Sequence, residues 1–179
     1  MNFVLAFIII KFAVYPGLGL MLQTSHPVVA VVSESMEHNK GFDEWWDSAG
    51  KWYAANNINK AYFSGFTLKN GFDKGDIMVL KGKKPEDIKT GDVIVFWSAK
   101  KDPIIHRVVN KWKEKDAYYF KTKGDNNPMP ITSPYLDENK ISEEQVVGNA
   151  VLRIPFLGYI KILFVEILNL LSATLGQKG

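Results

Sequence analysis

Two serines, Ser33 and Ser35, flank a glutamate in the stretch VVSESMEH, residues 31–38. A serine hydroxyl is a poor nucleophile until a base removes its proton and a further group orients that base. The chain contains no cysteine, which excludes a thiol nucleophile, a disulfide framework and a cysteine-based zinc site. Nucleophilic chemistry in this protein would therefore depend on a hydroxyl group with a base beside it.

Three histidines could supply that base. His26 precedes a proline and has the character of a turn or interfacial residue. His38 follows Ser35 so closely along the chain that triad geometry is unfavourable. His106 lies in PIIHRVV, a β-branched stretch typical of a strand, and a strand is a rigid support for a catalytic side chain. We take His106 as the candidate base, although a lone strand histidine also occurs as a purely structural residue.

An acidic residue is needed to orient the imidazole, and the stretch TKGDNNP, residues 122–128, offers Asp125 directly after an expected strand. The same sequence is also typical of an ordinary turn. Ser35, His106 and Asp125 would form a Ser-His-Asp triad, an arrangement defined by geometry and not by order along the chain. The next acidic residue, Asp137, could fill the same role if the proline-containing loop folds back.

Composition excludes some classes of function. The formal net charge is +3, and the lysines are scattered among acidic residues instead of forming one basic block. This pattern does not favour nucleic-acid binding. We expect no metal and no cofactor, so the chemistry would rest on side chains alone.

The N-terminal residues 2–22 form an apolar run interrupted by Lys11. A helix of that length reaches about 30 Å, which matches the hydrocarbon core of a bilayer. The run has no basic start and is not followed by a convincing small-residue cleavage site, as a cleavable signal peptide would be. We therefore interpret residues 2–22 as an uncleaved transmembrane anchor.

Residues 26–155 are expected to form the main, mostly β domain. A strand begins after Pro27, and further short strands are predicted in GDIMVL, GDVIVFW, IIHRVVNKW, AYYFKTKG and VVGNAVLRI. Many short strands separated by turns predict a barrel or sandwich. Asp76 and Asp92, each after a glycine at the start of a strand, are interpreted as structural turn residues.

Two helical additions accompany this domain. An insertion at about residues 39–66 carries aromatic side chains at helical spacing, which predicts either a small separate core or a face resting at the membrane interface. The C-terminal residues 156–175 are mostly apolar and predict a helix that spans the membrane or lies along it. The overall expectation is a mainly β protein with an N-terminal transmembrane helix, a helical insertion and a C-terminal apolar helix.

Several motifs in order resemble one known family. A serine followed by methionine after a membrane anchor, two GD(I/V) strands, HRVV, TKGDNNP and VVGNAVLRIPFLGYI together resemble type I signal peptidase, in its archaeal and endoplasmic-reticulum branch. The resemblance covers residues 2–36 and 72–160. The bacterial branch has a lysine where this chain has His106, so the resemblance is to the histidine type.

The resemblance implies a membrane-bound serine endopeptidase that removes signal peptides from secreted and membrane preproteins. It implies Ser35 as the nucleophile, His106 as the general base and Asp125 as the orienting group. The backbone N–H of Ser35, with the Ser33 hydroxyl, would stabilise the oxyanion, although Ser33 could also serve only in packing. The implied partners are signal peptides, the lipid bilayer and the translocon. The implied location is a plasma or endoplasmic-reticulum-type membrane, crossed once or twice, with the catalytic domain on the extracytoplasmic face.

The chain departs from the family pattern in two places. The family usually has proline where His38 stands and lacks the long aromatic insertion. It also has a second aspartate about six residues after the first, where this chain has Ile131, so the third member of the triad is either Asp125 or Asp137.

Two other functions remain open from the sequence. A non-catalytic, membrane-anchored β subunit of a protein-processing complex would be marked by loss of the serine or the base, whereas Ser35 and His106 are both present here. A related self-cleaving repressor protease would carry a DNA-binding helix-turn-helix in place of the apolar N-terminal run.

Overall fold

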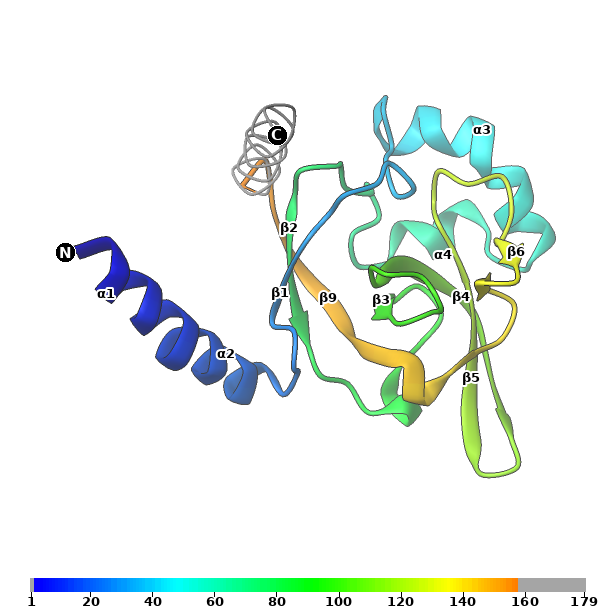
Figure 1. Ribbon diagram of the computed structural model, residues 1–179. Helices are drawn as coiled ribbons and strands as arrows, with labels where there is room; N and C mark the ends of the chain where they lie inside the picture. The colour runs from blue at the N-terminus through cyan, green and yellow to red at the C-terminus, as the bar shows by residue number, and fades with distance from the viewer. Residues whose placement is uncertain (1, 158–179) are drawn as a thin grey trace, which may run out of the picture.

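A curled antiparallel sheet of seven strands forms the centre of the protein (Figure 1). The computed structural model describes residues 2–157. The strand order is β1-β2-β9-β3-β4-β5-β8, and a two-stranded ribbon, β6-β7, lies beside it. The strands are β1 (Val28–Ala30), β2 (Ile77–Lys81), β3 (Val93–Phe96), β4 (Ile104–Glu114), β5 (Ala117–Lys123), β6 (Thr132–Ser133), β7 (Leu136–Asp137), β8 (Ile141–Ser142) and β9 (Val146–Ile154). The predicted mainly β fold is confirmed.

Strand β9 joins the two halves of this sheet. It pairs with β2 on one side and β3 on the other, and each pairing contains a register shift that bends the strand. Apolar residues then face inward and form two groups of buried side chains. One comprises Val31, Met36, Phe72, Met78, Leu80, Val93, Val95 and Ala150, and the other Ile88, Ile94, Phe96, Val108, Phe120, Leu136 and Ile141.

The turns before β2 and β3 are built on the two aspartates that the sequence marked as structural. The Asp76 carboxylate accepts the backbone N–H of Asp73 at 2.8 Å, and Asp92 accepts that of Lys89 at 2.7 Å. Gly91, directly before Asp92, adopts a φ of +98°, a conformation that favours glycine. Both aspartates therefore fix strand entry, as predicted.

The N-terminal residues form three consecutive helical segments that project from the sheet (Figure 1). These are α1 (Asn2–Ile9), a π-helical turn at Ile10–Val14, and α2 (Tyr15–Leu22). The π turn, in which Tyr15 N–H donates to the Ile10 carbonyl, precedes Pro16, which has no N–H to give. Within residues 2–157, none of the helices has both the length and the apolar character that crossing a bilayer requires. Residues 2–22, predicted as one transmembrane helix, are thus divided into three shorter helical segments, and the predicted span is not confirmed.

The C-terminal apolar helix expected at residues 156–175 lies outside the described residues, apart from its first two positions. Two short 3-10 helices, Pro85–Asp87 and Glu143–Gln145, complete the connections between strands.

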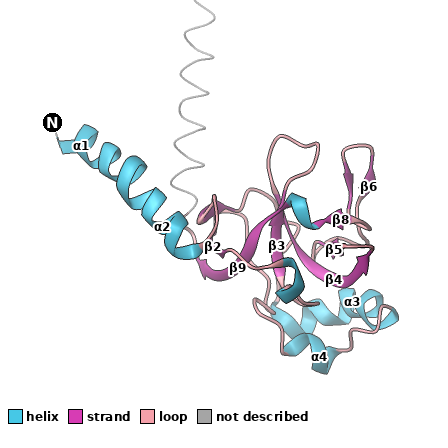
Figure 2. Ribbon diagram, turned by 90° about the horizontal axis from the view of Figure 1, so that it is seen from below, coloured by secondary structure: helices cyan, strands magenta, loops and turns pink. Residues whose placement is uncertain are grey.

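The helical insertion contains α3 (Gly41–Ala55) and α4 (Lys60–Ser64), which lie together beside β4 (Figure 2). Its aromatic side chains form a core of their own, in which Tyr53 and Phe63 are fully buried and which also includes Val109 of β4. Of the two readings that the sequence allowed, the structure shows the separate core. The insertion is therefore attached to the same strand that carries His106.

Candidate active site

Ser35 lies in the bend that follows the edge strand β1. Two backbone hydrogen bonds, from Val31 N–H to Asp76 and from Gly75 N–H to Val31, hold the end of this segment against the turn before β2. Met36 is fully buried in the sheet core, while Ser35 is only half-buried. The apolar neighbour thus anchors the bend and leaves the hydroxyl accessible.

His106 meets this serine from strand β4. Its Nε2 atom lies 2.9 Å from the Ser35 Oγ, although 71 positions separate the two residues along the chain. The imidazole is 3% exposed, and pairing of β4 with β3 fixes its backbone opposite Ile94. The structure therefore brings together the nucleophile and the base that the sequence singled out.

Ser33 stands next to the same hydroxyl. Its Oγ lies 3.1 Å from the Ser35 Oγ, and both groups face the accessible side of the bend. A second hydroxyl at this distance can donate a hydrogen bond to charge that develops beside the nucleophile.

The other imidazole nitrogen contacts a residue that the sequence analysis did not select. Glu138 Oε1 lies 2.5 Å from His106 Nδ1. The Glu138 carboxylate also accepts bonds from the Thr122 hydroxyl at 2.8 Å and the Ile131 backbone N–H at 2.7 Å. With Nδ1–H directed at this carboxylate, Nε2 is left to accept the Ser35 proton.

Glu138 has the charge that this role requires. Burial raises the pKa of its carboxyl, but the hydrogen bond and charge of His106, with the bonds from Ile131 and Thr122, outweigh burial and leave the pKa below its ordinary value. The group is therefore an acceptor at neutral pH. It is fully buried, so little water competes for its oxygens.

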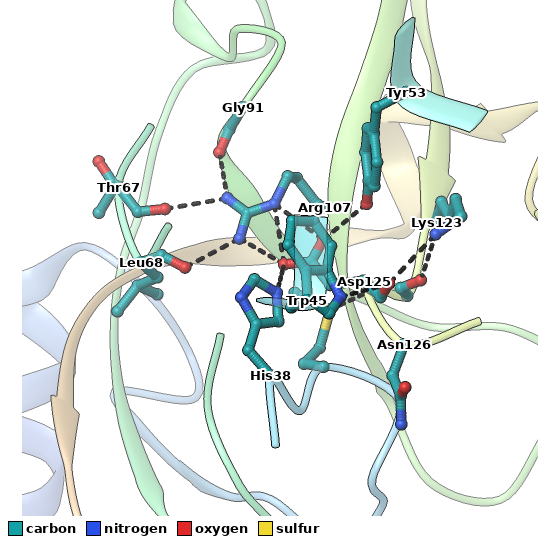
Figure 3. Close-up of polar contacts among 12 residues, drawn as sticks. His38, Trp45, Tyr53, Thr67, Leu68, Gly91, Arg107, Lys123, Asp125 and Asn126 are labelled. Carbon is teal, nitrogen blue, oxygen red and sulfur yellow. Dashed lines mark hydrogen bonds and ion pairs between the residues drawn. The ribbon is translucent and has the colours of Figure 1, made fainter. Parts of the chain in front are cut away.

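Asp125 lies in a different place from the one expected. Its carboxylate accepts bonds from Arg107, His38 and Tyr53 (Figure 3). Among the described residues, no hydrogen bond joins it to the His106 imidazole, whose two nitrogens contact Ser35 and Glu138. The Tyr53 hydroxyl donates at 2.8 Å and the Arg107 Nη2 at 2.7 Å. Asp125 is thus the centre of a second buried network, adjacent to the first.

Arg107 compensates the charge of Asp125 completely. All of its guanidinium nitrogens donate: Nε and Nη2 to Asp125, and the remaining N–H groups to the carbonyls of Thr67, Leu68 and Gly91. Burial raises the pKa of the Asp125 carboxyl, yet the Arg107 charge and the His38 bond reverse this and hold the pKa well below its usual range. The pair is buried, paired and fully hydrogen-bonded, as a charge in a protein interior must be.

His38 ties the aromatic insertion to this network. Its Nε2 lies 3.1 Å from Asp125 Oδ2, and its ring stacks on Trp45 with 3.7 Å between ring centroids. Trp45 in turn donates its indole N–H to the Asp125 carbonyl at 3.2 Å. Two aromatic residues of the insertion, Trp45 and Tyr53, therefore hold the turn that contains Asp125.

That turn also touches the Ser35 and His106 pair. Asn126 N–H donates to the Ser35 carbonyl at 2.8 Å. A Cβ placed on Gly124 would lie 2.8 Å from the Ser35 carbonyl oxygen and 2.9 Å from His106 Nε2, so glycine is needed there for the two segments to approach. Asp125 acts on the site through the position of its backbone.

A groove with a volume of about 300 Å³ opens beside the two catalytic candidates. Its lining includes Ser33, Ser35 and His106, together with apolar side chains of the β1 segment and the start of β4: Ala30, Val32, Ile104 and Ile105. The dimensions and lining suit an extended peptide with small apolar side chains.

Glu138 was not predicted from the sequence, which instead offered its neighbour Asp137 as the alternative third member of the triad. Asp137, the alternative third member, is exposed at the end of β7 and accepts the Asn139 backbone N–H. Side chains alternate between the two faces of an extended segment, so the residue after Asp137 points inward. The alternation of exposed and buried residues in LDE was the available signal.

A serine hydroxyl bonded to a histidine whose far nitrogen meets a carboxylate is the catalytic arrangement of serine hydrolases, the class that includes the serine proteases. No family model matches the chain. Curated relatives named signal peptidase complex catalytic subunit do match it. The protein of Sclerotinia sclerotiorum is 29% identical over 94% of this chain and 81% of its own length, and that of Fusarium vanettenii is 29% identical over 100% and 87%. The protein of Clavispora lusitaniae is 34% identical over 63% of this chain and 69% of its own length. The chain belongs to the family of signal peptidase catalytic subunits, the endoplasmic-reticulum branch of type I signal peptidase.

Proposed function

We propose that this protein is a serine endopeptidase that removes N-terminal signal peptides, with Ser35 as nucleophile, His106 as general base and Glu138 as the orienting group. The observation that carries the proposal is the 2.9 Å contact between Ser35 Oγ and His106 Nε2. Family membership supplies the substrate class, because the relatives carry the name of the signal peptidase catalytic subunit.

The reaction follows from the geometry. His106 Nε2 takes the hydroxyl proton while Ser35 Oγ attacks the scissile carbonyl, and the resulting imidazolium is stabilised by Glu138. The Ser35 backbone N–H and the Ser33 hydroxyl stabilise the oxyanion. His106 then returns the proton to the departing amine, which leaves an acyl group on Ser35. A water molecule, deprotonated by the same imidazole, hydrolyses this ester.

In this proposal Glu138 replaces Asp125 as the third member of the triad. Asp125 already uses both carboxylate oxygens on Arg107, His38 and Tyr53. A carboxylate committed to a buried guanidinium is a poor partner for an imidazolium that must form and disappear in every cycle. Its role is to hold the turn that supports the active site.

Substrate binding is proposed to use the edge of the sheet. Within the described residues, β1 pairs only with β2, so its other edge can receive an extended peptide by β-strand addition. The groove beside it would accept the small apolar residues that the family prefers before the cleavage site. Main-chain pairing explains how one enzyme can accept many unrelated signal peptides.

The helical run of residues 2–22 is proposed to anchor the domain at a membrane of the endoplasmic-reticulum type, with the site on the extracytoplasmic face. Several of its described apolar side chains, among them Phe7, Phe12 and Leu20, are exposed. Few residues separate Leu22 from Ser35, so an anchor there would hold the nucleophile near the depth of the substrate's cleavage site. The proposed partners are signal peptides, lipid, the translocon and, because the relatives are named as parts of a complex, further subunits.

The test is cleavage of a preprotein by the full chain in detergent, compared with Ser35→Ala. We expect loss of about 10⁴-fold or more in rate. Ser64→Ala, which removes an exposed hydroxyl from α4, is the matched control and should leave cleavage unchanged. Equal processing by wild type and Ser35→Ala would reject the nucleophile and would favour a non-catalytic subunit.

A further inference from the structure

A second cavity lies at the end of helix α2. It shares no lining residue with the groove beside Ser35. It has a volume of about 440 Å³ and is lined by Gln23, the loop after β2 and the middle of β9. The last residue of β2 and the segment after it contribute three lysines, Lys81, Lys83 and Lys84, and one carboxylate, Asp87. The cavity is therefore basic on balance.

The position of this cavity is fixed by direct contact with the N-terminal helix. Gly82 N–H donates to the Leu22 carbonyl at 2.7 Å, and a Cβ on Gly82 would collide with the Gln23 backbone. The loop is thus held against the last turn of the apolar run. If that run enters a membrane, the lysines lie at the level where it leaves the bilayer.

The lysines differ in availability. Lys83 is paired with Asp92 at 2.6 Å. Among residues 2–157, the ammonium groups of Lys81 and Lys84 have no ion pair or side-chain hydrogen bond of their own. Two cations therefore remain available to an anionic ligand.

Asn149 gives the cavity a polar floor. Lys81 and Asn149 are register partners on β2 and β9, which places their side chains on the same face of the sheet. Asn149 is 7% exposed, lines the cavity, and its Oδ1 has no hydrogen-bond partner among the described residues. A buried amide without a partner is costly, and a ligand that offers a hydroxyl or ammonium donor would satisfy it.

One apolar side chain, Val151 of β9, lines the cavity and is 40% exposed. Leu20 and Met21 of the adjoining helix α2 lie outside the lining and are also exposed. Cations, an unpaired amide and apolar side chains in one place match the chemistry of a phospholipid at its headgroup, where phosphate, polar donors and acyl chains meet.

We infer that this cavity binds the headgroup of an anionic phospholipid, with the phosphate at Lys81 and Lys84 and a headgroup donor at Asn149. The inference rests on the membrane anchoring proposed above, but not on the catalytic residues. A lipid bound here would fix the domain against the bilayer at a second point, away from the helix axis. It would thereby limit the rotation of the Ser35 groove relative to the membrane surface.

The test is calorimetric titration of the full chain in a non-ionic detergent with dihexanoyl-phosphatidylglycerol. Dihexanoyl-phosphatidylcholine and inorganic phosphate are titrated in parallel. We expect saturable binding of the anionic lipid, weaker binding of the zwitterionic lipid and much weaker binding of phosphate. The double variant Lys81→Gln/Lys84→Gln should reduce the affinity by about 25-fold, at about fivefold per lysine.

The matched control is Lys51→Gln/Lys74→Gln, which removes the same charge from exposed positions outside the cavity. Asn149→Asp, which keeps the side-chain shape but adds a negative charge, should also weaken lipid binding. Thermal melting without lipid checks that each variant is folded. Equal affinity for both lipids, or equal loss in the control, would overturn the inference, and binding of free phosphate as strong as that of the lipid would reassign the site to phosphate.

Cleavage of a short soluble peptide separates this inference from the catalytic proposal. The cavity variants should cleave such a peptide at the wild-type rate, because Ser35 and His106 are unchanged. If peptide cleavage is absent even in wild type while the lipid binds, the catalytic proposal fails and the lipid site stands.

Discussion

Glu138 Oε1 lies 2.5 Å from His106 Nδ1, on the side of the imidazole opposite Ser35. The glutamate comes from the residue after the short strand β7, and the histidine from the long strand β4. This contact supports the proposal that the orienting group is Glu138, which lies outside the Gly-Asp-Asn turn of residues 124–126. It also gives the two buried carboxylates, Glu138 and Asp125, separate tasks that can be tested one at a time.

Glu138→Gln is expected to lower kcat by between about 100-fold and 10⁴-fold with little change in stability. The amide keeps the shape of the side chain but can present N–H to the imidazole, which favours the wrong tautomer and does not stabilise the imidazolium. Asp137→Asn, one residue away and exposed, is the matched control and should retain full activity. If Asp137→Asn were the damaging change, the assignment of Glu138 would be wrong.

Asp125→Asn is expected mainly to lower the free energy of unfolding. It leaves the Arg107 guanidinium buried without its counter-charge, which costs about 3–5 kcal/mol in the free energy of unfolding. In wild type this contribution is present above the ordinary carboxyl pKa of 3.8 and is lost as the pH falls through the lower folded-state pKa. Urea unfolding at pH 7 measures the change; a stability equal to wild type, together with lost cleavage, would instead support Asp125 as a catalytic residue.

Gly124→Ala should impair catalysis although the substitution adds only a methyl group. The new Cβ would lie 2.8 Å from the Ser35 carbonyl oxygen and 2.9 Å from His106 Nε2, so the two segments must separate. A displacement of about 1 Å between catalytic groups can reduce kcat about 100-fold. Gly65→Ala, whose Cβ would meet only an ordinary contact at 3.5 Å, serves as the control in the same cleavage assay. Unchanged activity of Gly124→Ala would show that the turn does not set this geometry.

Lys123 should make the free energy of unfolding depend on pH in the alkaline range. Burial lowers the pKa of its ammonium to about 8 from 10.5, although Asp125 and Glu138 act in the opposite direction. Between these two pKa values the folded state loses a proton that the unfolded state keeps, so the free energy of unfolding rises with pH, by up to roughly 3 kcal/mol.

The measurement for Lys123 is chemical unfolding from pH 7.5 upward in wild type and in Lys123→Met. The difference between the two proteins should change across this window, because the variant has no group that titrates at that position. Taking the difference removes the effect of Tyr53, whose pKa is raised well above 10.0 by burial and by Asp125. A constant difference at all pH values would refute the shift.

The longer strands could be predicted from the sequence, because β-branched runs bounded by glycine and aspartate favour strands, whereas the two-residue strands β6, β7 and β8 were not predicted. The predicted stretch VVGNAVLRI coincides with β9, and IIHRVV begins β4. The resemblance to signal peptidase also predicted Ser35 and His106 as nucleophile and base, and the structure places these two side chains 2.9 Å apart.

Which carboxylate lies against the His106 imidazole depends on the fold and could not be predicted from the sequence. Asp125 follows a strand, as the sequence indicated. Its carboxylate, however, is bound by Arg107 and by Tyr53 of the aromatic insertion. A guanidinium can form two hydrogen bonds to a carboxylate at once, which makes this ion pair strong. Glu138 reaches His106 because the β6-β7 ribbon folds back over β5, where Thr122 and Ile131 hold its oxygens. Such contacts depend on packing between segments that are distant along the chain, and local patterns of residue type do not contain that information.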